Sequence, residues 1–493
     1  MKKRIEFILK VLVFIVVLGM CVVGVNSILV SKYVDDSNFP TSATYKGFYE
    51  MEKDSIDVIF LGSSRASCAF SPQELYNMYE IRSYNLGCEM QNVLVSYYWL
   101  KEALRFQSPK VVVLETGMIF PYRSDEPLNT SIECTRKAMD YMKWSEVKWQ
   151  AVKDICSYDE TQSWESYVLP NIQFHDRWQE LSRNDFAQKD LYGNLKLKGQ
   201  TVLPNFYHSW DNEGRFQVIK SEEEKMHTIM ERYLDKMVQL CKEADVELIL
   251  VSVPSAFDSV EKYNMIEKYS AENGLLFIDY NEVKMNEQIE YNYKIDNAEY
   301  HHVGINGTYK LAKHFGKILQ NKYCINGIQD EQWEITKSYY EQIIEENNLR
   351  ENYDVEKYFE ILNDSKYSIF IAAQNVNIYN GIPLYIKDIL SQFALNKELW
   401  REDAGNRYYA VINESEVAEK NHHAPIDTNG TLAQGKVQYS IQSDVEDSSI
   451  IIDGVQCSKQ KEGLNIVVYS NVRNRVVDSI TLSFENGIGI ITR

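Results

Sequence analysis

Two short segments, far apart along the chain, hold the residues whose types and spacing point to chemistry. The first is Gly62-Ser63-Ser64, which follows an apolar run over 56–61 and opens a predicted helix. A serine at such a turn has its hydroxyl raised out of the sheet, with free backbone N–H groups behind it that can bind an oxyanion. The second segment holds Glu299 three residues before His302. A histidine oriented by a carboxylate can take the proton of a serine hydroxyl, so we expect Ser64 as nucleophile, His302 as general base and Glu299 as orienting acid.

Each of these roles has an alternative in the sequence. Ser63 can be the nucleophile instead, although the register to the strand end favours Ser64. His301 competes with His302, whose spacing to the last predicted helix of this region favours it. Asp296 is the alternative acid if its loop folds back. Most serines at helix starts only cap the helix, so Ser64 alone would indicate a structural role, and its combination with the histidine segment favours catalysis.

Apolar runs that alternate with amphipathic runs predict the elements that position these residues. Alternating strands and helices predict a parallel sheet covered on both faces, with ligands bound outside the carboxyl ends of the strands. Ser64 follows the first predicted strand, Gly87 follows the second, and Glu115 and Pro254 close two later ones, so these residues should meet at one edge. The predicted strands cover 56–61, 83–86, 110–115, 247–253 and 275–280, and the predicted helices cover 72–79, 93–106, 226–244, 260–273 and 307–319.

The N-terminal region predicts a membrane anchor. Basic residues at positions 2–4 precede the uncharged run 11–30, which at 1.5 Å per residue is about 30 Å long and can cross a bilayer once. The positive-inside tendency places residues 1–10 in the cytoplasm and the rest of the chain outside, beginning with a linker over 31–50. A cleaved signal peptide is the alternative, but the run is long and has no small-x-small cleavage site.

Composition limits the class of protein. A chain of 493 residues is too long for one core, so we expect more than one domain. A formal net charge of −19 argues against nucleic acid as a partner, because phosphate binding needs clustered Lys and Arg. The eight cysteines are scattered singly, without a Cys/His cluster, so the sequence predicts neither a zinc site nor a dense disulfide framework, and we expect no metal and no cofactor.

A long insert over 121–201 interrupts the α/β pattern. Inserts of this size in compact domains are usually lids or substrate-binding elements. Within it, His175, Arg177 and Trp178 are candidate substrate contacts, since an arginine beside aromatic rings suits sugars or carboxylates. The other interpretation is a surface patch that packs Trp178 on the domain. Arg65, next to Ser64, either holds an anionic group of the substrate or pairs with Asp57 or Glu115.

Residues 51–325 resemble the SGNH (GDSL-like) hydrolase superfamily, and specifically its branch of membrane-anchored proteins that act in cell-surface O-acylation. The resemblance lies in three blocks, namely Gly62-Ser63-Ser64, Asn85-Leu86-Gly87 and His302-Val303-Gly304-Ile305-Asn306-Gly307. It implies an α/β/α sandwich around a parallel sheet.

The same resemblance implies roles for individual residues. Ser64 would be the nucleophile, His302 the base and Glu299 the acid, with the backbone amides of Ser64 and Gly87 as oxyanion donors. The chain departs from the family pattern at three places. Ser63 and Glu299 stand where the family usually has Asp, and Leu114-Glu115-Thr116-Gly117-Met118 replaces a block that carries an oxyanion-hole Asn. These departures set the chain apart from an ordinary esterase.

The C-terminal part has a different pattern, after a charged helical linker predicted over 326–365. Residues 366–493 resemble the ILEI/PANDER-type domain, on the strings Ser449-Ile450-Ile451-Ile452-Asp453-Gly454, Gly463-Leu464-Asn465-Ile466-Val467-Val468-Tyr469 and Val476-Val477-Asp478-Ser479. The resemblance implies a small β-rich module that reads glycans. The predicted strands cover 367–373, 407–412, 436–442, 449–452, 464–469 and 476–484, with a helix over 382–393.

Together these observations predict a single-pass cell-membrane protein whose bulk is extracytoplasmic. Its expected activity is transfer of an acyl group, most simply acetyl, through an acyl-serine onto a cell-surface polysaccharide. The resemblance implies a polytopic membrane O-acyltransferase as the acyl donor. One alternative is a polysaccharide O-acetyl esterase that uses the same residues, and the other is a non-catalytic glycan-binding or assembly protein.

Overall fold

The structure of the chain is a computed structural model, and it describes residues 2–29, 41–123, 125–181, 183–186, 196–204, 222–413, 416–432 and 437–493. Parts of the predicted 31–50 linker and of the 121–201 insert lie outside these residues. The chain divides into two units, Met1–Tyr340 and Glu341–Arg493. The division falls inside α16 (Glu331–Glu351), within the stretch where the sequence predicts a helical linker.

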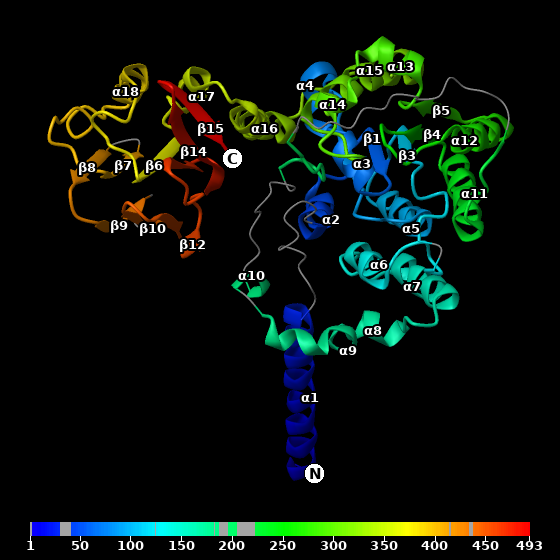
Figure 1. The fold of residues 1–493 in the computed structure, drawn as a ribbon. Helices are drawn as coiled ribbons and strands as arrows, with labels where there is room; N and C mark the ends of the chain where they lie inside the picture. The colour runs from blue at the N-terminus through cyan, green and yellow to red at the C-terminus, as the bar shows by residue number, and fades with distance from the viewer. Residues whose placement is uncertain are drawn as a thin grey trace. The chain divides into compact units, whose positions relative to one another are not determined.

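A five-stranded parallel sheet forms the centre of the first unit, as predicted (Figure 1). Its strand order is β2-β1-β3-β4-β5, and every neighbouring pair is parallel. Mainly apolar runs form four of these strands because both faces of the sheet are buried, whereas β2 carries the polar residues Ser83 and Asn85. The strands are β1 Val58–Leu61, β2 Ser83–Asn85, β3 Val111–Glu115, β4 Glu247–Ser252 and β5 Leu276–Asp279.

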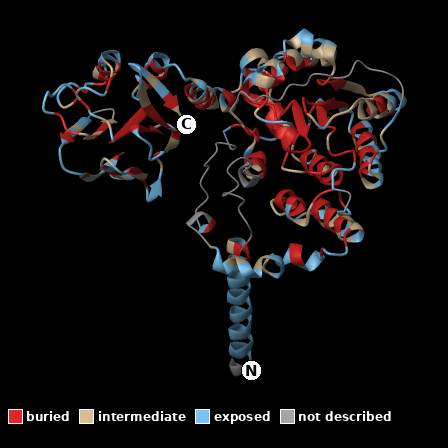
Figure 2. Cartoon of the chain, in the orientation of Figure 1, coloured by how far each residue is buried: buried red, intermediate tan, exposed pale blue. Residues whose placement is uncertain are grey.

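Helices cover both faces of this sheet. Alternate residues of β1 point to opposite sides, so that Ile59 and Leu61 join one apolar core while Val58 and Phe60 join the other. The strands are accordingly buried in Figure 2. The first core is closed by α2 Thr41–Glu50, α5 Val93–Ala103, α6 Ile132–Met139, α7 Glu146–Tyr158, α11 Thr228–Glu243 and α12 Val260–Asn273. The second is closed by α3 Ser64–Ala69, α4 Pro72–Tyr79, α13 Val283–Ile289, α14 Tyr293–Asp296 and α15 Ile305–Tyr323.

Helix α2 lies in the stretch for which the sequence predicts a linker. Tyr45 stacks on Trp99 of α5 with 4.2 Å between ring centroids, and Phe48 makes edge contacts with Tyr84 and Trp99. Tyr45 and Phe48 are fully buried. Two aromatic side chains three positions apart lie on one face of a helix, and this face was hidden in the sequence by the polar residues around it.

Helix α1 (Lys2–Leu29) is long and apolar enough to cross a membrane. Within its stretch Arg4–Leu29, the most apolar 18 residues have a mean hydropathy of 2.9 and are unburied, and they belong to the exposed rod in Figure 2. A signal sequence meets the same criteria, so the fold identifies α1 as a candidate span.

The second unit is a separate antiparallel β-rich region. A six-stranded sheet has the order β15-β14-β13-β6-β7-β8, and a four-stranded sheet has the order β12-β11-β10-β9. Residues of the central strand β6 alternate between the helix side (Ile369, Ile371) and the side of the smaller sheet (Phe370, Ala372). Its elements are α17 Val355–Leu362, β6 Tyr367–Gln374, α18 Leu384–Ser391, β7 Arg407–Asn413, β8 Glu416–His422, β9 Ile426–Leu432, β10 Val437–Ser443, β11 Ser448–Ile452, β12 Val455–Gln456, β13 Gly463–Ser470, β14 Arg475–Glu485 and β15 Ile488–Thr492.

Strands β8, β9, β12 and β15 were not predicted from the sequence. All four are edge strands: β15 and β8 are the two edges of the six-stranded sheet, and β12 and β9 are the two edges of the four-stranded sheet. Edge strands have one free side and carry polar or charged residues that discourage aggregation, as Glu416–His422 does. The apolar pattern of β8 and β9 is therefore weak, and β12 has only two residues, whereas β15 is short but mainly apolar.

The packing of α2 can be tested by truncating one of its buried rings. We expect Phe48→Ala to lower the free energy of unfolding of the first unit by about 3–5 kcal/mol, because it leaves a cavity in the core. Glu50→Ala, an exposed position on the same helix, should change it by less than about 0.5 kcal/mol. Denaturant unfolding followed by tryptophan fluorescence measures both, and equal small effects would show that residues 41–50 are a linker.

Candidate active site

The chain passes from β1 into α3 through a tight turn that places two serines at the sheet edge. Gly62 has φ +140°, and a Cβ there would lie 2.7 Å from Glu115 Cβ, so the turn requires glycine. Ser63 caps α3, and its Oγ accepts a hydrogen bond of 3.2 Å from the Arg65 N–H. Ser64 is the first residue of α3, so its hydroxyl faces the carboxyl ends of the strands.

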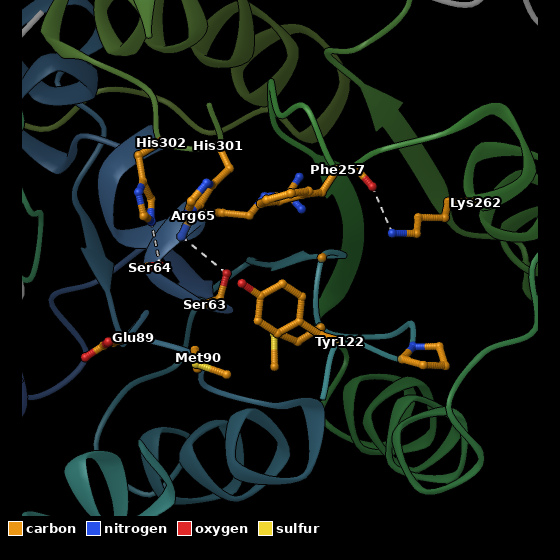
Figure 3. Close-up of a pocket in the computed structure, with 13 residues that line it drawn as sticks. Ser63, Ser64, Arg65, Glu89, Met90, Tyr122, Phe257, Lys262, His301 and His302 are labelled. Carbon is orange, nitrogen blue, oxygen red and sulfur yellow. Dashed lines mark hydrogen bonds between the residues drawn. The ribbon is translucent and has the colours of Figure 1, made fainter. Parts of the chain in front are cut away.

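The structure brings together Ser64, His302 and Glu299, as the sequence arrangement suggests (Figure 3 shows Ser64 and His302). Ser64 Oγ lies 2.7 Å from His302 Nε2, and Glu299 Oε1 contacts His302 Nδ1. In the tautomer that satisfies both contacts, Nδ1–H donates to the carboxylate and Nε2 accepts from the serine hydroxyl. The hydrogen bond from His302 lowers the pKa of Glu299, so this half-exposed carboxyl is ionised at neutral pH.

A short closed loop holds His302 against Ser64. The loop is pinned by a β-bridge between Asn297 and Val303, immediately before α15 begins. Helix α15 is in turn bound to α3, because Thr308 Oγ1 donates to the Cys68 carbonyl at 2.9 Å. The position of the histidine therefore depends on the same helix that carries the serine.

The alternative acid, Asp296, lies at the other end of this loop and has other partners. Its Oδ2 accepts from Lys310 Nζ at 2.7 Å and from the Asn292 N–H at 2.6 Å, so this oxygen is held away from the histidines. Its backbone carbonyl accepts from the Gly304 N–H, which helps to close the loop. In this structure Asp296 holds the loop, and Glu299 holds His302.

His301 is a wall of the site and does not contact Ser64. Its ring lies between Phe257, with 5.1 Å between centroids, and His302, with 4.3 Å. Burial, with a smaller effect of the neighbouring His302, lowers the pKa of His301 to about 4. His301 is therefore neutral in the range where His302 would act as a base.

A buried charge cluster joins the ends of three strands beside the serines. Arg65 lies within 3.3 Å of Glu115 Oε1 at the end of β3 and within 2.6 Å of Asp258 Oδ2 in the loop after β4. It also donates to the Val253 carbonyl at 3.1 Å. Burial alone would lower the pKa of Arg65, but Asp258 and Glu115 outweigh it and raise that pKa, so the guanidinium stays charged. Arg65 thus has two carboxylate partners, and in this structure it is not free to hold a substrate anion.

Glu115 also binds the groups that would otherwise point into the site. Ser63 Oγ donates to Glu115 Oε2 at 2.8 Å, and the Gly117 N–H donates to Oε1 at 2.7 Å. Ser63 is thereby engaged as a cap and donor, whereas Ser64 faces the histidine.

Of the two expected oxyanion donors, the backbone amides of Ser64 and Gly87, only one is available in this structure. The Gly87 N–H donates to Asn85 Oδ1 at 2.9 Å, and Asn85 is itself fixed by two bonds to the carbonyls of Ala66 and Phe70. The Gly87 amide is therefore occupied. Among the residues that the structure describes, the Ser64 N–H has no hydrogen-bond acceptor, so it is the donor available for an oxyanion at the serine.

The serine and histidine open into a pocket of about 160 Å³ that is continuous with solvent; Figure 3 shows the residues that line it. One side of it is aromatic. Tyr122 lies 6.3 Å from Phe257, which in turn packs on His301. Tyr122 and Phe257 are 51% and 48% exposed, so their rings are accessible to a ligand. The other lining residues are Ser63, Arg65, Glu89, Met90, Gly117, Met118, Pro121 and Lys262.

The insert residues predicted to contact substrate do not line this pocket. His175 and Trp178 are exposed, and Arg177 Nη1 donates to the Leu29 carbonyl of α1 at 2.8 Å. Of the 121–201 insert, only Pro121 and Tyr122 are among the pocket-lining residues. The part of the insert over 187–195 lies outside the described residues.

Sequence reasoning missed Asp258, Phe257 and Tyr122. The first two follow Pro254, which marks the end of β4, so their place at the active edge could have been inferred from the strand end. Nothing in the sequence indicated that Asp258 pairs with Arg65.

One group in the described part of the chain has the ligand atoms to hold a metal ion, namely Glu299, His301 and His302. Both nitrogens of His302 already have partners, Ser64 and Glu299. A bound ion would therefore compete with the serine chemistry.

Comparisons with known proteins add little. No protein-family model matches the chain, and no curated protein matches it. Among solved structures, the chain is similar to a GDSL-like lipase from Bacteroides thetaiotaomicron, at 10% identity and a TM-score of 0.27, over 57% of this chain and 98% of that one. At this TM-score the likeness decides nothing about function, which rests on the geometry of the site.

The lowered pKa of His301 predicts an effect on stability. Between its folded pKa of about 4 and the ordinary value near 6.5, the unfolded chain binds a proton that the folded chain does not. The free energy of unfolding should therefore fall as the pH drops through this window. We expect His301→Gln, which cannot titrate, to make that decline shallower. Urea unfolding of both proteins from pH 4 to 8 measures it, and parallel curves would contradict the assignment.

Proposed function

We propose that this chain is a membrane-anchored extracytoplasmic enzyme that moves an acyl group through an acyl-serine formed on Ser64. The observation that carries the proposal is the 2.7 Å contact between Ser64 Oγ and His302 Nε2, with Glu299 on the opposite ring nitrogen. Nucleophile, base and orienting acid in this relation are the working parts of serine acyl enzymes on unrelated folds.

The chemistry follows from the contacts. His302 Nε2 takes the hydroxyl proton as Ser64 Oγ attacks the acyl carbonyl, and the Glu299 carboxylate stabilises the imidazolium. The tetrahedral intermediate collapses, the leaving alcohol receives the proton from His302, and the acyl group remains on Ser64. A second hydroxyl then gives its proton to His302 and attacks the acyl-serine. The bond between the acyl carbon and Ser64 Oγ breaks, and Oγ takes the proton back from His302, which restores the free enzyme.

Stabilisation of the oxyanion is the weakest part of this site. The Ser64 N–H is available, but the Gly87 and Gly117 amides donate to Asn85 and Glu115. Loss of one oxyanion donor typically lowers kcat by about 10²–10³-fold. We therefore expect a slow enzyme unless the Gly87 amide is released when substrate binds.

We propose transfer of an acetyl group onto a cell-surface polysaccharide as the physiological reaction, with a polytopic membrane O-acyltransferase as donor. Helix α1 supports this proposal, since a tethered enzyme can meet a donor in the same bilayer. The exposed rings of Tyr122 and Phe257 suit the flat face of a sugar. The sequence resemblance to surface O-acylation proteins and to a glycan-related C-terminal module points the same way.

A polysaccharide O-acetyl esterase is the second candidate, and the openness of the pocket favours it. Among the described residues nothing closes the pocket over Ser64, so water has a path to an acyl-serine. Hydrolysis would use the same three residues.

Ser64 should be the residue that reacts with a serine-directed fluorophosphonate probe. We expect Ser64→Ala and His302→Gln to abolish labelling, because the first removes the nucleophile and the second its base. Ser63→Ala should still be labelled, more slowly, since it loses a helix cap and a hydrogen bond to Glu115. Mass spectrometry locates the adduct. Labelling that follows Ser63 would contradict the assignment, and an unlabelled wild type would favour a non-catalytic glycan-binding role.

Transfer and hydrolysis can be separated by the time course of acetyl release. The purified full chain is mixed with an acetylated polysaccharide in the absence of an acceptor. A transferase should then remove no more acetyl groups from the polysaccharide than there are enzyme molecules, because each acetyl group stays on Ser64. An acceptor oligosaccharide should then give continued turnover. Steady release into water would identify the esterase, and Ser64→Ala serves as the blank in each reaction.

A further inference from the structure

A row of exposed apolar side chains runs along the insert. None of these side chains lines the pocket at Ser64. The row lies on α8 (Trp164–Val168), α9 (Asn171–Phe174), the 3₁₀ helix η1 (His175–Gln179) and α10 (Arg183–Phe186), a region we call the α8–α10 segment. Its exposed apolar residues are Trp164, Val168, Leu169, Ile172, Trp178 and Phe186, with exposed fractions between 39% and 67%. Trp164 and Val168 are four residues apart and lie on one face of α8, and Ile172 lies on the next helix, α9. A soluble surface rarely gathers so many large apolar groups on one short segment.

The α8–α10 segment is bound to the C-terminal end of α1. The Asn171 N–H donates to Asn26 Oδ1 at 2.9 Å, and Arg177 donates to the Leu29 carbonyl at 2.8 Å. Arg177 is held in place by Asp185 at 2.6 Å. A guanidinium on the last carbonyl of a helix satisfies an otherwise unpaired acceptor and suits the helix dipole. Figure 1 shows these short helices around the end of α1.

The length of α1 places this contact at the membrane surface. The uncharged run begins at Val11, after Lys10, and about 20 residues of helix are needed to cross the hydrocarbon core of roughly 30 Å. The far side of that core is therefore reached near the end of α1. Residues 26 and 29, which bind the α8–α10 segment, lie at that depth.

We propose that the α8–α10 segment binds the surface of the lipid bilayer, with its exposed apolar side chains inserted at the level of the headgroups. Tryptophan is enriched at this level of membranes, and interfacial helices bury an apolar face about 5–10 Å into the headgroup boundary. This gives Trp178 a lipid contact in place of the substrate contact that the sequence predicts. The inference rests on α1 crossing a membrane and does not depend on the chemistry of Ser64.

The charges of the segment indicate which force binds it. Glu165, Asp176 and Glu180 are exposed beside the apolar side chains, and its arginine at 177 is already paired. Anionic lipid would repel this surface. Insertion is therefore driven by apolar burial, and neutral phosphatidylcholine should be sufficient.

Quenching by brominated lipid tests the inference in the full chain reconstituted into phosphatidylcholine nanodiscs. Trp178→Phe removes one emitter, and the difference from the wild type gives the emission of Trp178 itself. In that Trp178→Phe background, Ile172→Trp adds a reporter within the α8–α10 segment, and Tyr309→Trp adds one on α15 as a control. The two positions are matched, being 47% and 48% exposed.

We expect lipid brominated near the headgroup end of its chains to remove most of the emission of Trp178 and of Ile172→Trp, and none of that of Tyr309→Trp. Equal emission from Ile172→Trp in brominated and ordinary nanodiscs would overturn the proposal, as would equal quenching of all three reporters. A chain that does not enter nanodiscs contradicts the anchor and the proposal with it. Loss of serine labelling with normal quenching would contradict only the proposed enzyme activity.

Discussion

The arrangement of the active edge depends on one buried ion cluster, in which Arg65 is shared by Glu115 and Asp258. Arg65 follows the end of β1, Glu115 is the last residue of β3, and Asp258 lies in the loop after β4. Each of these three buried charges would destabilise the fold by several kcal/mol if it had no partner, and together they would approach the whole free energy of unfolding of a domain. The strands β1, β3 and β4 must therefore end where these side chains can meet. The serine turn and the loop after β4 are fixed relative to each other as a result.

This cluster also shapes the pocket beyond its own contacts. Asp258 follows Phe257, and the neighbouring Ala256 N–H donates to the Tyr300 carbonyl at 2.8 Å. The loop that supplies the carboxylate thus also supplies the ring against His301 and the contact to the histidine loop. Glu115 has a less favourable effect, since it holds the Ser63 hydroxyl and the Gly117 amide that could otherwise face an oxyanion. The hydrogen bonds that stabilise the ion cluster therefore use the same donors that an oxyanion would need.

The sequence was informative where a local pattern determines structure. Apolar runs predicted four strands of the parallel sheet, because strands buried on both faces are mostly apolar, and the short run that ends at Gly87 predicted β2. Ser64, His302 and Glu299 could be paired because each stands beside a recognisable strand end or helix start. Asp258 could not be assigned to Arg65, since 193 residues separate the two and only the folded sheet brings them together. Likewise, the buried face of α2 could not be predicted, because its two buried rings lie in a polar stretch. The contact of Arg177 with α1 could not be predicted either, because the residues next to Arg177 in the sequence give no sign of it.

In the proposed reaction, the fate of an acyl group on Ser64, transfer to water or to a sugar, depends on what covers the pocket. Ser64 and His302 are themselves buried, so water reaches them only through the pocket mouth. Tyr122 and Phe257 line the pocket and are about half exposed, which leaves apolar surface that a ligand in the pocket can bury. A sugar ring stacked on these aromatics would exclude water from the acyl-serine and present a hydroxyl to His302 in the same step. Water exclusion would then come from the acceptor itself, so that the acyl-serine persists only for as long as a glycan occupies the aromatic wall.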